Sequence, residues 1–347
     1  MVNQQKIGRI EVSPILDNNR ATFLFHGADQ PYLVGDFNFW NWSSGLPFTR
    51  FADGTWRLTL DFPADTYMEY ALLVKGSREV DPLNPRRLNS GTGDINNWFY
   101  MPSGGPHPLS RRTRLQGNLT KHLVTDDVYL LNGKRSIYFY QPAAPGPYPL
   151  LVVYDGADYL YRGRLPSIVD QLIAAGKIQP LALALVPNAG KARFAEYACG
   201  DAIPMFVERR VLPLAYQALS LIDIQRHPGS FGVLGASMGG MMALHTALSK
   251  PQIFGKVLCQ AGAFQMYGED FSILERVKNI PPVDLQIWLD VGKFDFLNTV
   301  NHRMQALFLE KKIRVTFREI NGGHNYTTWR NDLPYGLEEL FPAIISK

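Results

Sequence analysis

The segment best suited to chemistry is Gly235-Ala-Ser237-Met-Gly239, which has the pattern G-x-S-x-G. The pattern is short, but an apolar stretch, residues 231–234, runs into it and a helix-forming stretch, residues 241–248, follows it. A strand that turns sharply into a helix exposes the serine hydroxyl above the end of the strand. Such a turn needs glycine because a Cβ would clash with its neighbours. The context predicts a nucleophilic serine at Ser237, and an ordinary glycine-rich turn is the alternative.

A serine nucleophile needs a base, because its hydroxyl is a poor nucleophile at neutral pH. Three histidines follow the serine: His245, His302 and His324. His245 falls within the helix after the turn and points away from the serine, and His302 lies early in an amphipathic helix, where a surface role is expected. His324 follows an expected strand through Asn321-Gly-Gly323. The order serine, acid, histidine along the chain therefore predicts His324 as the base.

Two aspartates compete as the carboxylate that would orient this histidine. The expected strand over residues 285–289 ends at Asp290, whereas Asp295 lies further into the following loop, with room to reach across to a histidine. Either carboxylate could instead cap the loop through local backbone hydrogen bonds. Position alone leaves the choice between the two open.

An oxyanion hole needs two convergent backbone N–H groups. One is expected from Met238, directly after the nucleophile. The other is expected from the loop after an early central strand, residues 154–157, where we favour the N–H of Ala157 because Gly156 allows a close approach.

Beyond about residue 115, apolar strands alternate with helices, which predicts a mainly parallel sheet covered on both faces. The expected strands cover residues 150–154, 181–186, 230–234, 256–260, 285–289 and 314–320, and a hairpin joins 128–131 to 135–141 around Asn132-Gly133. The expected helices lie near residues 166–175, 203–219, 239–248, 300–311 and 337–345.

Residues 1–104 follow a different pattern of short, aromatic-rich, alternating segments: 21–25, 32–34, 55–62 and 68–74. Turn signals such as Asp53-Gly54 separate them, and no helix-length periodicity is present. A small sandwich of two antiparallel sheets is the simplest fold for such strands. A stretch rich in Pro and Gly, followed by Arg111, Arg112 and Arg114, marks a boundary. The expected organisation is a β-sandwich over 1–104, a linker over 105–114 and an α/β domain over 115–347.

Composition excludes several classes of protein. The 347 residues are 46% hydrophobic and 19% charged, with a net charge of +4 and scattered basic residues, so we expect a globular protein that binds neither nucleic acid nor membrane. The early residues show no signal sequence. Cys199 and Cys259 form no disulfide framework and have no metal-ligand spacing. We therefore expect a cytoplasmic setting, no metal and no cofactor.

The motifs around Ser237, the downstream Gly292-Lys-Phe-Asp295-Phe-Leu and Gly322-Gly-His324-Asn-Tyr-Thr-Thr-Trp329 resemble the Putative esterase family, which includes esterase D, feruloyl esterases and enterochelin esterases. The resemblance spans roughly residue 115 to the end and includes Asp155-Gly156 and the stretch 193–197. It implies an α/β-hydrolase fold and a Ser237–His324–Asp295 triad, because the acid of the family follows a Gly-x-x-Asp pattern. Asn325 departs from the Asp that often follows the histidine in this family.

The residue types suggest candidate side chains for substrate binding but do not specify the substrate. Arg162, Arg164, Arg193 and Arg330 are candidates to line a cleft for an acidic or catecholate ligand, and the alternative is a set of solvated arginines or salt bridges such as Arg193 with Glu196. Tyr159 and Trp329 are candidates to flank an aromatic acyl group, and simple packing is the alternative.

The N-terminal half is similar to early-set, immunoglobulin-like modules such as the glycogen-binding domain of AMP-activated kinase, through the string Gly35-Asp-Phe-Asn-Phe-Trp40 and later turns. Related modules bind α-glucans with exposed tryptophans, for which Trp40, Trp42 and Trp56 are the candidates. Aromatic residues at such strand ends more often fill a small core. We therefore expect a cap that shapes the ester pocket, as the resemblance to enterochelin esterases implies, and carbohydrate binding is the alternative.

The leading hypothesis is a serine carboxylesterase of the enterochelin (siderophore) type that acts on a small-molecule ester. A carbohydrate-directed feruloyl or acetyl esterase is the first alternative. The second is a non-catalytic carbohydrate-binding protein with a vestigial hydrolase domain.

Overall fold

The computed structural model describes residues 12–91, 93–125, 127–131, 133–198 and 200–344. The chain forms two compact units, each described here by itself. The first comprises residues 1–105 with 321–323, and the second comprises residues 106–320 with 324–347. Expectations for the first eleven residues, Asn132, Cys199 and Ile345 lie outside the described residues.

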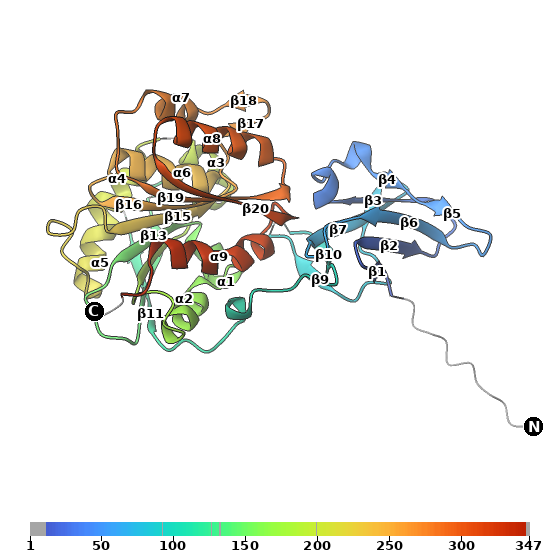
Figure 1. Cartoon of the computed structure of the whole chain (residues 1–347), viewed down its shortest axis with the longest axis horizontal. Helices are drawn as coiled ribbons and strands as arrows, with labels where there is room; N and C mark the ends of the chain where they lie inside the picture. The colour runs from blue at the N-terminus through green and yellow to red at the C-terminus, as the bar shows by residue number, and fades with distance from the viewer. Residues whose placement is uncertain (1–11, 92, 126, 132, 199, 345–347) are drawn as a thin grey trace, which may run out of the picture. The chain divides into compact units, whose positions relative to one another are not determined.

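The first unit consists of two antiparallel sheets (Figure 1). One sheet has the order β1 (Ile15–Asp17), β2 (Arg20–Phe25), β6 (Trp56–Asp61), β5 (Thr49–Arg50). The other has the order β4 (Leu46–Pro47), β3 (Pro31–Gly35), β7 (Tyr67–Val74), β10 (Ile95–Tyr100), β9 (Arg87–Asn89), and β8 (Ser77–Glu79) pairs with β7. The four expected strands are confirmed, as is the turn at Asp53-Gly54, where Gly54 has a φ of 83°.

The core of this unit lies between its two sheets. Phe23 of β2 meets Tyr70 of β7 and Phe99 of β10 edge to face, with ring centroids 5.0 and 5.8 Å apart. The expectation that Trp40, Trp42 and Trp56 fill this core is wrong. Trp42 is 43% exposed and the other two are half-buried, because the strand-borne aromatic rings already occupy the space between the sheets.

The second unit is built on an eight-stranded sheet, seen nearly edge-on in Figure 1. Its order is β11 (Asn118–Val124), β12 (Arg135–Gln141), β14 (Ala182–Val186), β13 (Leu150–Tyr154), β15 (Phe231–Ala236), β16 (Phe254–Gln260), β19 (Gln286–Phe294), β20 (Arg314–Gly323). Pairing is parallel from β14 to β19 and antiparallel from β11 to β14. The strands alternate with helices along the chain, as the sequence predicts for a mainly parallel sheet.

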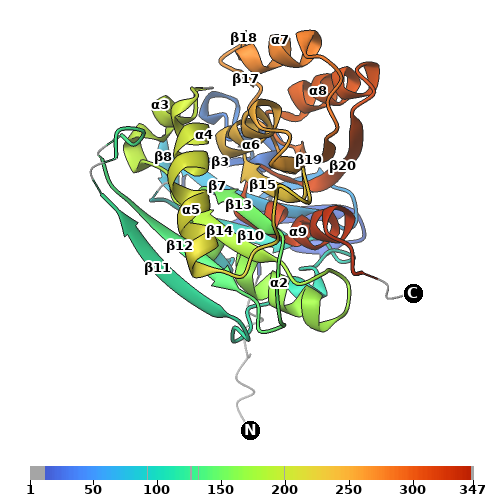
Figure 2. The same cartoon turned by 90° about the vertical axis from the view of Figure 1, so that its left-hand side faces the viewer.

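Helices cover both faces of this sheet and enclose two separate hydrophobic cores (Figures 1 and 2). One face carries a helical stretch made of α4 (Ala202–Phe206), a π-helical turn (Val207–Val211) and α5 (Leu212–Ala218), together with α6 (Met238–Ser249), α7 (Ser272–Asn279) and α8 (Asn298–Glu310). The other face carries α1 (Gly156–Tyr161), α2 (Leu165–Ala174) and α9 (Tyr326–Leu340). None of the described helices has the length and apolar character needed to cross a bilayer.

The expected hairpin that begins at residues 128–131 is wrong. These residues form a turn in which the Asp127 carboxylate accepts a hydrogen bond from the Tyr129 N–H (2.9 Å), and Val128 is 86% exposed. The antiparallel partner of β12 is instead β11. Figure 2 shows these two strands at one edge of the sheet.

Two elements near the C-terminus also differ from expectation. The strand β19 runs five residues beyond the expected end at Leu289, which places Asp290 inside the sheet. The last described helix begins at Tyr326, because the Asn325 side chain caps it by accepting a hydrogen bond from the Thr328 N–H (2.9 Å). The same helix continues past Pro334. The helix expected over 337–345 is therefore placed too late.

Candidate active site

The turn between β15 and α6 holds Ser237 in a strained backbone conformation, with φ 57° and ψ −125°. Such a conformation costs on the order of 1–3 kcal/mol for a residue other than glycine. Three backbone hydrogen bonds maintain it: the Ser237 N–H donates to the Gln260 carbonyl (2.8 Å), and the Ser237 carbonyl accepts from the N–H groups of Ala263 (3.0 Å) and Met241 (3.1 Å). The side chain of Ser237 is half-buried at the start of α6, so its hydroxyl lies beside a helix N-terminus.

Glycine is required at Gly235 for steric reasons. A Cβ at this position would lie 2.2 Å from the carbonyl oxygen of Gly239, in the backbone of the following helix. The backbone cannot yield as a flexible side chain would, so the close contact of β15 with α6 depends on this glycine.

His324 and Asp295 are hydrogen-bonded partners. Nδ1 of His324 lies 2.8 Å from Oδ2 of Asp295. The carboxylate is buried, and its Oδ1 accepts a hydrogen bond from the Leu297 N–H (2.8 Å). Asp295 thus both caps its own loop and fixes the imidazole, with one oxygen for each contact.

Two aromatic rings hold the imidazole of His324. Phe296 lies 4.6 Å away between ring centroids, and Trp329 meets it edge to face at 4.9 Å. Trp329 is buried, whereas Phe296 is 55% exposed. The sequence analysis assigned no role to Phe296. Its position directly after Asp295 could have indicated that its ring lies close to His324.

Asp290, the competing acid, lies in a different environment. Burial, and then the neighbouring carboxyl of Asp332, raise the pKa of Asp290 well above its usual value. Burial also raises the pKa of Asp332 to about 6, against the opposing charge of Arg318. Among the described residues, Oδ1 of Asp290 and Oδ2 of Asp332 have no hydrogen-bond partner. Asp290 is therefore a buried internal brace, whose Oδ2 accepts hydrogen bonds from Gln260 and Trp288.

The turn from β13 into α1, the helix that carries Ala157, is fixed by Asp155, a buried residue in the left-handed region at φ 52°. Its carboxylate receives two hydrogen bonds from Arg193, Nε to Oδ1 at 2.7 Å and Nη2 to Oδ2 at 2.6 Å. The same Nη2 donates to the Ala236 carbonyl at 3.3 Å. Arg193 therefore links the loop before Ala157 to the turn before Met238.

The rest of the 193–197 segment, which forms α3 (Arg193–Tyr197), supports this network. Glu196 forms a buried ion pair with Arg135 at 2.6 Å, so the salt bridge between Arg193 and Glu196 that the sequence left as an alternative is wrong. The Tyr197 hydroxyl accepts a hydrogen bond from the Asp155 N–H at 3.2 Å.

The candidate substrate residues lie mostly inside the protein. Tyr159 is fully buried and donates its hydroxyl to Gln260 at 3.0 Å, so it packs rather than flanks a ligand. Trp329 is buried against His324, and Arg193 is engaged with Asp155. Arg330 is half-buried and donates to the Arg162 carbonyl at 3.3 Å.

The two other downstream histidines have structural partners. His302 is exposed and lies 3.0 Å from Glu319, which confirms its surface role, and His245 lies 3.0 Å from Asp201. Within the described ranges, no three His, Cys, Asp or Glu side chains come together to hold a metal ion. Cys259 is buried as a free thiol.

A family model described as Putative esterase matches residues 129–340, well over half of the chain. The chain belongs to the Putative esterase family. Family membership makes the protein an enzyme, a carboxylesterase, which excludes the non-catalytic alternative.

The relatives and the solved structures that this esterase resembles include enterobactin esterases in both sets. The iron(III) enterobactin esterase of Escherichia coli O6:H1 is 24% identical over 274 residues, which is 76% of this chain and 68% of the relative. The ferric enterobactin esterase of Salmonella typhimurium matches the structure with a TM-score of 0.79 at 19% identity, over 96% of this chain and 97% of its own. The Shigella flexneri enterobactin esterase, crystallised in the presence of enterobactin, matches with a TM-score of 0.78 at 19% identity, over 97% of this chain and 99% of its own. The fold is accordingly of the α/β-hydrolase type.

We predict that Gly235→Ala lowers the thermal unfolding temperature by several degrees and removes ester hydrolysis, because the new methyl group would press on the backbone of Gly239. Gly200→Ala is the matched control, since a Cβ there meets nothing within 4 Å and the backbone φ is ordinary. Differential scanning calorimetry would measure the unfolding temperature of each variant, and a p-nitrophenyl acetate assay would measure its rate of ester hydrolysis. Equal behaviour of the two variants would contradict the steric assignment.

The two aspartates give a second prediction. Asp295→Asn should lower kcat/KM by roughly 10⁴, because an amide stabilises the wrong histidine tautomer. Asp290→Asn should leave hydrolysis within about threefold of wild type, because an amide oxygen can accept the hydrogen bonds from Gln260 and Trp288 that the carboxyl oxygen accepts. Greater damage from Asp290→Asn, in a variant whose circular dichroism is native, would reverse the choice of acid.

Proposed function

We propose that the protein is a serine carboxylesterase that acts through Ser237, His324 and Asp295 and an acyl-enzyme intermediate. The observation that carries the proposal is the 2.8 Å contact between His324 Nδ1 and Asp295 Oδ2, together with the strained turn at Ser237. With Nδ1 held by the carboxylate, the lone pair of Nε2 is available to accept a proton.

In the first half of the reaction, the Ser237 Oγ attacks the ester carbonyl carbon while its proton passes to Nε2 of His324. The carbonyl oxygen becomes an oxyanion, which the backbone N–H groups of Met238 and Ala157 stabilise. Both residues lie in first helical turns, where N–H groups have no intrahelical acceptor. The C–O bond then breaks, and His324 gives its proton to the departing alcohol oxygen.

In the second half, a water molecule attacks the acyl-enzyme carbonyl and transfers a proton to His324. The second tetrahedral intermediate collapses, the acid product leaves, and Ser237 Oγ regains its proton from Nε2. Asp295 stays ionised throughout and stabilises the imidazolium that forms in each half. Arg193 positions the two N–H donors and takes no part in proton transfer.

The substrate we propose is a siderophore ester of the enterobactin type. The relatives with the printed activity of iron(III) enterobactin esterases support this choice, as does the likeness over nearly the whole chain to structures crystallised with enterobactin and with 2,3-dihydroxy-N-benzoyl-serine. A carbohydrate-directed feruloyl or acetyl ester is the alternative within the same chemistry.

We predict that Ser237→Ala lowers turnover by a factor on the order of 10⁶ while the unfolding temperature stays close to wild type. Ser220→Ala, at an exposed serine of the same unit, is the control and should hydrolyse esters normally. The assay compares p-nitrophenyl acetate, a methyl ferulate and enterobactin. A Ser237→Ala variant with wild-type rates would refute the nucleophile, and preference for the ferulate over enterobactin would favour the alternative substrate.

A second function, carbohydrate binding, is favoured by one feature of the first unit. The exposed Trp42 and half-buried Trp40 have ring centroids 6.3 Å apart, and the Arg78 guanidinium lies 5.9 and 6.0 Å from the two rings. The Trp40 indole N–H donates to Asp36 at 2.9 Å, which fixes that ring. Such a platform of rings with a polar neighbour suits stacking on a sugar. The cap role implied by resemblance stays a prediction.

We predict that the protein is retarded in an amylopectin gel and that Trp42→Ala abolishes the retardation. Trp56→Ala is the control, because its indole N–H is bonded to the Gly27 carbonyl at 3.0 Å on the other sheet. Native circular dichroism of both variants excludes unfolding. Migration of the wild type at the same rate with and without amylopectin would dismiss glucan binding.

A further inference from the structure

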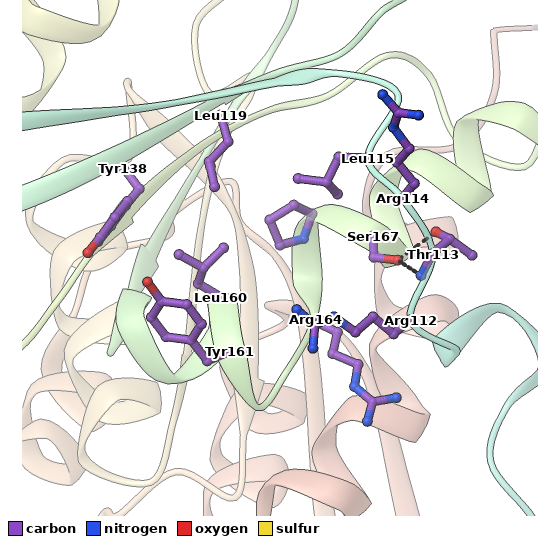
Figure 3. Close-up of a pocket in the computed structure, with 11 residues that line it drawn as sticks. Arg112, Thr113, Arg114, Leu115, Leu119, Tyr138, Leu160, Tyr161, Arg164 and Ser167 are labelled. Carbon is purple, nitrogen blue, oxygen red and sulfur yellow. Dashed lines mark hydrogen bonds between the residues drawn. The ribbon is translucent and has the colours of Figure 1, made fainter.

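A cavity of about 760 Å³ lies on the α1 and α2 side of the esterase unit, beside the edge strand β11 and its neighbour β12 (Figure 3). None of Ser237, Asp295 and His324 lines it. We propose that this cavity is a second binding site, distinct from the ester site, for an organic anion that carries an aromatic body and at least two negative charges. The proposal does not rest on the proposed catalytic mechanism.

Three arginines line the cavity: Arg112, Arg114 and Arg164. Arg112 and Arg114 are exposed and Arg164 is half-buried, and in the described part of the chain none of the three guanidinium groups pairs with a carboxylate. No Asp or Glu is among the lining residues. Three guanidinium groups without a carboxylate partner line one cavity, and a ligand with two or more negative charges can form charge-assisted hydrogen bonds with them.

The nearby carboxylates are occupied elsewhere. Asp170 of α2 is buried and accepts hydrogen bonds from the Gln116 N–H (2.7 Å) and the Tyr140 hydroxyl. Asp158 of α1 pairs with Arg162 at 3.3 Å. The positive charge of the cavity is therefore left for a ligand.

The segment that carries Arg112 and Arg114 is anchored to α2. The Thr113 N–H donates to the Ser167 Oγ at 2.9 Å, and the two hydroxyl groups lie 2.8 Å apart (Figure 3). Gln171 adds a hydrogen bond to the Arg111 carbonyl at 2.9 Å. These contacts fix the backbone that presents the arginines, so less entropy is lost when a ligand binds.

Arg164 lies in the left-handed backbone region, with φ 54°, directly before α2. This conformation is strained for arginine, and glycine would adopt it without strain. The surrounding structure nevertheless aims a cationic side chain into the cavity from this position.

The opposite end of the cavity is apolar and aromatic. Figure 3 shows the rings of Tyr138 and Tyr161 near Leu160 at one end, and Arg112 and Arg164 at the other. A ligand with separate apolar and anionic parts matches this division, whereas inorganic anions match only the arginine end. The volume falls within the range of about 300–1,000 Å³ that small-molecule sites have.

The test uses the full chain and naphthalenedisulfonate, an aromatic dianion, in isothermal titration calorimetry. We expect saturable binding that weakens as KCl rises, no comparable binding of neutral naphthalenediol, and at least tenfold weaker binding of sulfate. Arg112→Gln and Arg164→Gln should each weaken naphthalenedisulfonate binding by about tenfold or more. Arg111→Gln is the matched control, because Arg111 precedes Arg112 but does not line the cavity, and it should bind within about twofold of wild type.

Calorimetric unfolding of each variant shows whether it is folded, and only the folded variants are compared. Absence of saturable naphthalenedisulfonate binding would overturn the proposal. Equal weakening of that binding by all three arginine substitutions would also overturn it, because the anion would then respond to the general surface charge. A rise in the KM for p-nitrophenyl acetate in proportion to the added naphthalenedisulfonate would also overturn it, because the anion would then occupy the ester site. Unchanged KM at saturating naphthalenedisulfonate supports two distinct sites.

Discussion

The ion pair between Asp155 and Arg193 is the contact on which the geometry of the active site depends. Asp155 is buried, so its carboxylate needs a partner, and Arg193 supplies both hydrogen bonds in the paired arrangement that suits a guanidinium group. Through the Ala236 carbonyl the same arginine reaches the turn at Ser237. Two segments that follow different strands, β13 and β15, are thereby linked through one side chain.

Around this contact, the site depends on groups that carry out no chemistry. The buried carboxyl group of Asp290 accepts a hydrogen bond from Gln260, whose side-chain oxygen accepts one from the Tyr159 hydroxyl, so a hydrogen-bond chain links β19 through β16 to α1. Trp329 presses its edge on His324 from the first turn of α9. Because interiors are close-packed, such neighbours restrict the histidine more tightly than its single carboxylate contact would.

The sequence predicts the turn at Ser237 well, because the need for glycine at a close backbone contact leaves a local signature in the residue types. It does not predict which arginine meets which carboxylate, since Asp155 is distant from Arg193 in the chain, whereas Glu196 lies within one helical turn of it. The start of α9 is missed because Tyr326-Thr-Thr-Trp329 consists of residues that favour strands, and the cap from Asn325 outweighs that preference. The tryptophans of the first unit are misjudged because hydrophobicity alone does not tell which aromatic rings a small core has room for.

The strand β20 is last in the sheet order and ends just before His324, whereas Asp295 follows its neighbour β19. An outermost strand in such a sheet is hydrogen-bonded along one side, and strands of this kind open at a lower free energy than those at the centre. Fraying of β20 would separate the imidazole from its carboxylate while β13, β15 and β16 remain folded. Under the proposed mechanism, mild denaturant or warming would then stop ester hydrolysis reversibly, before calorimetry or fluorescence detects unfolding of the two cores.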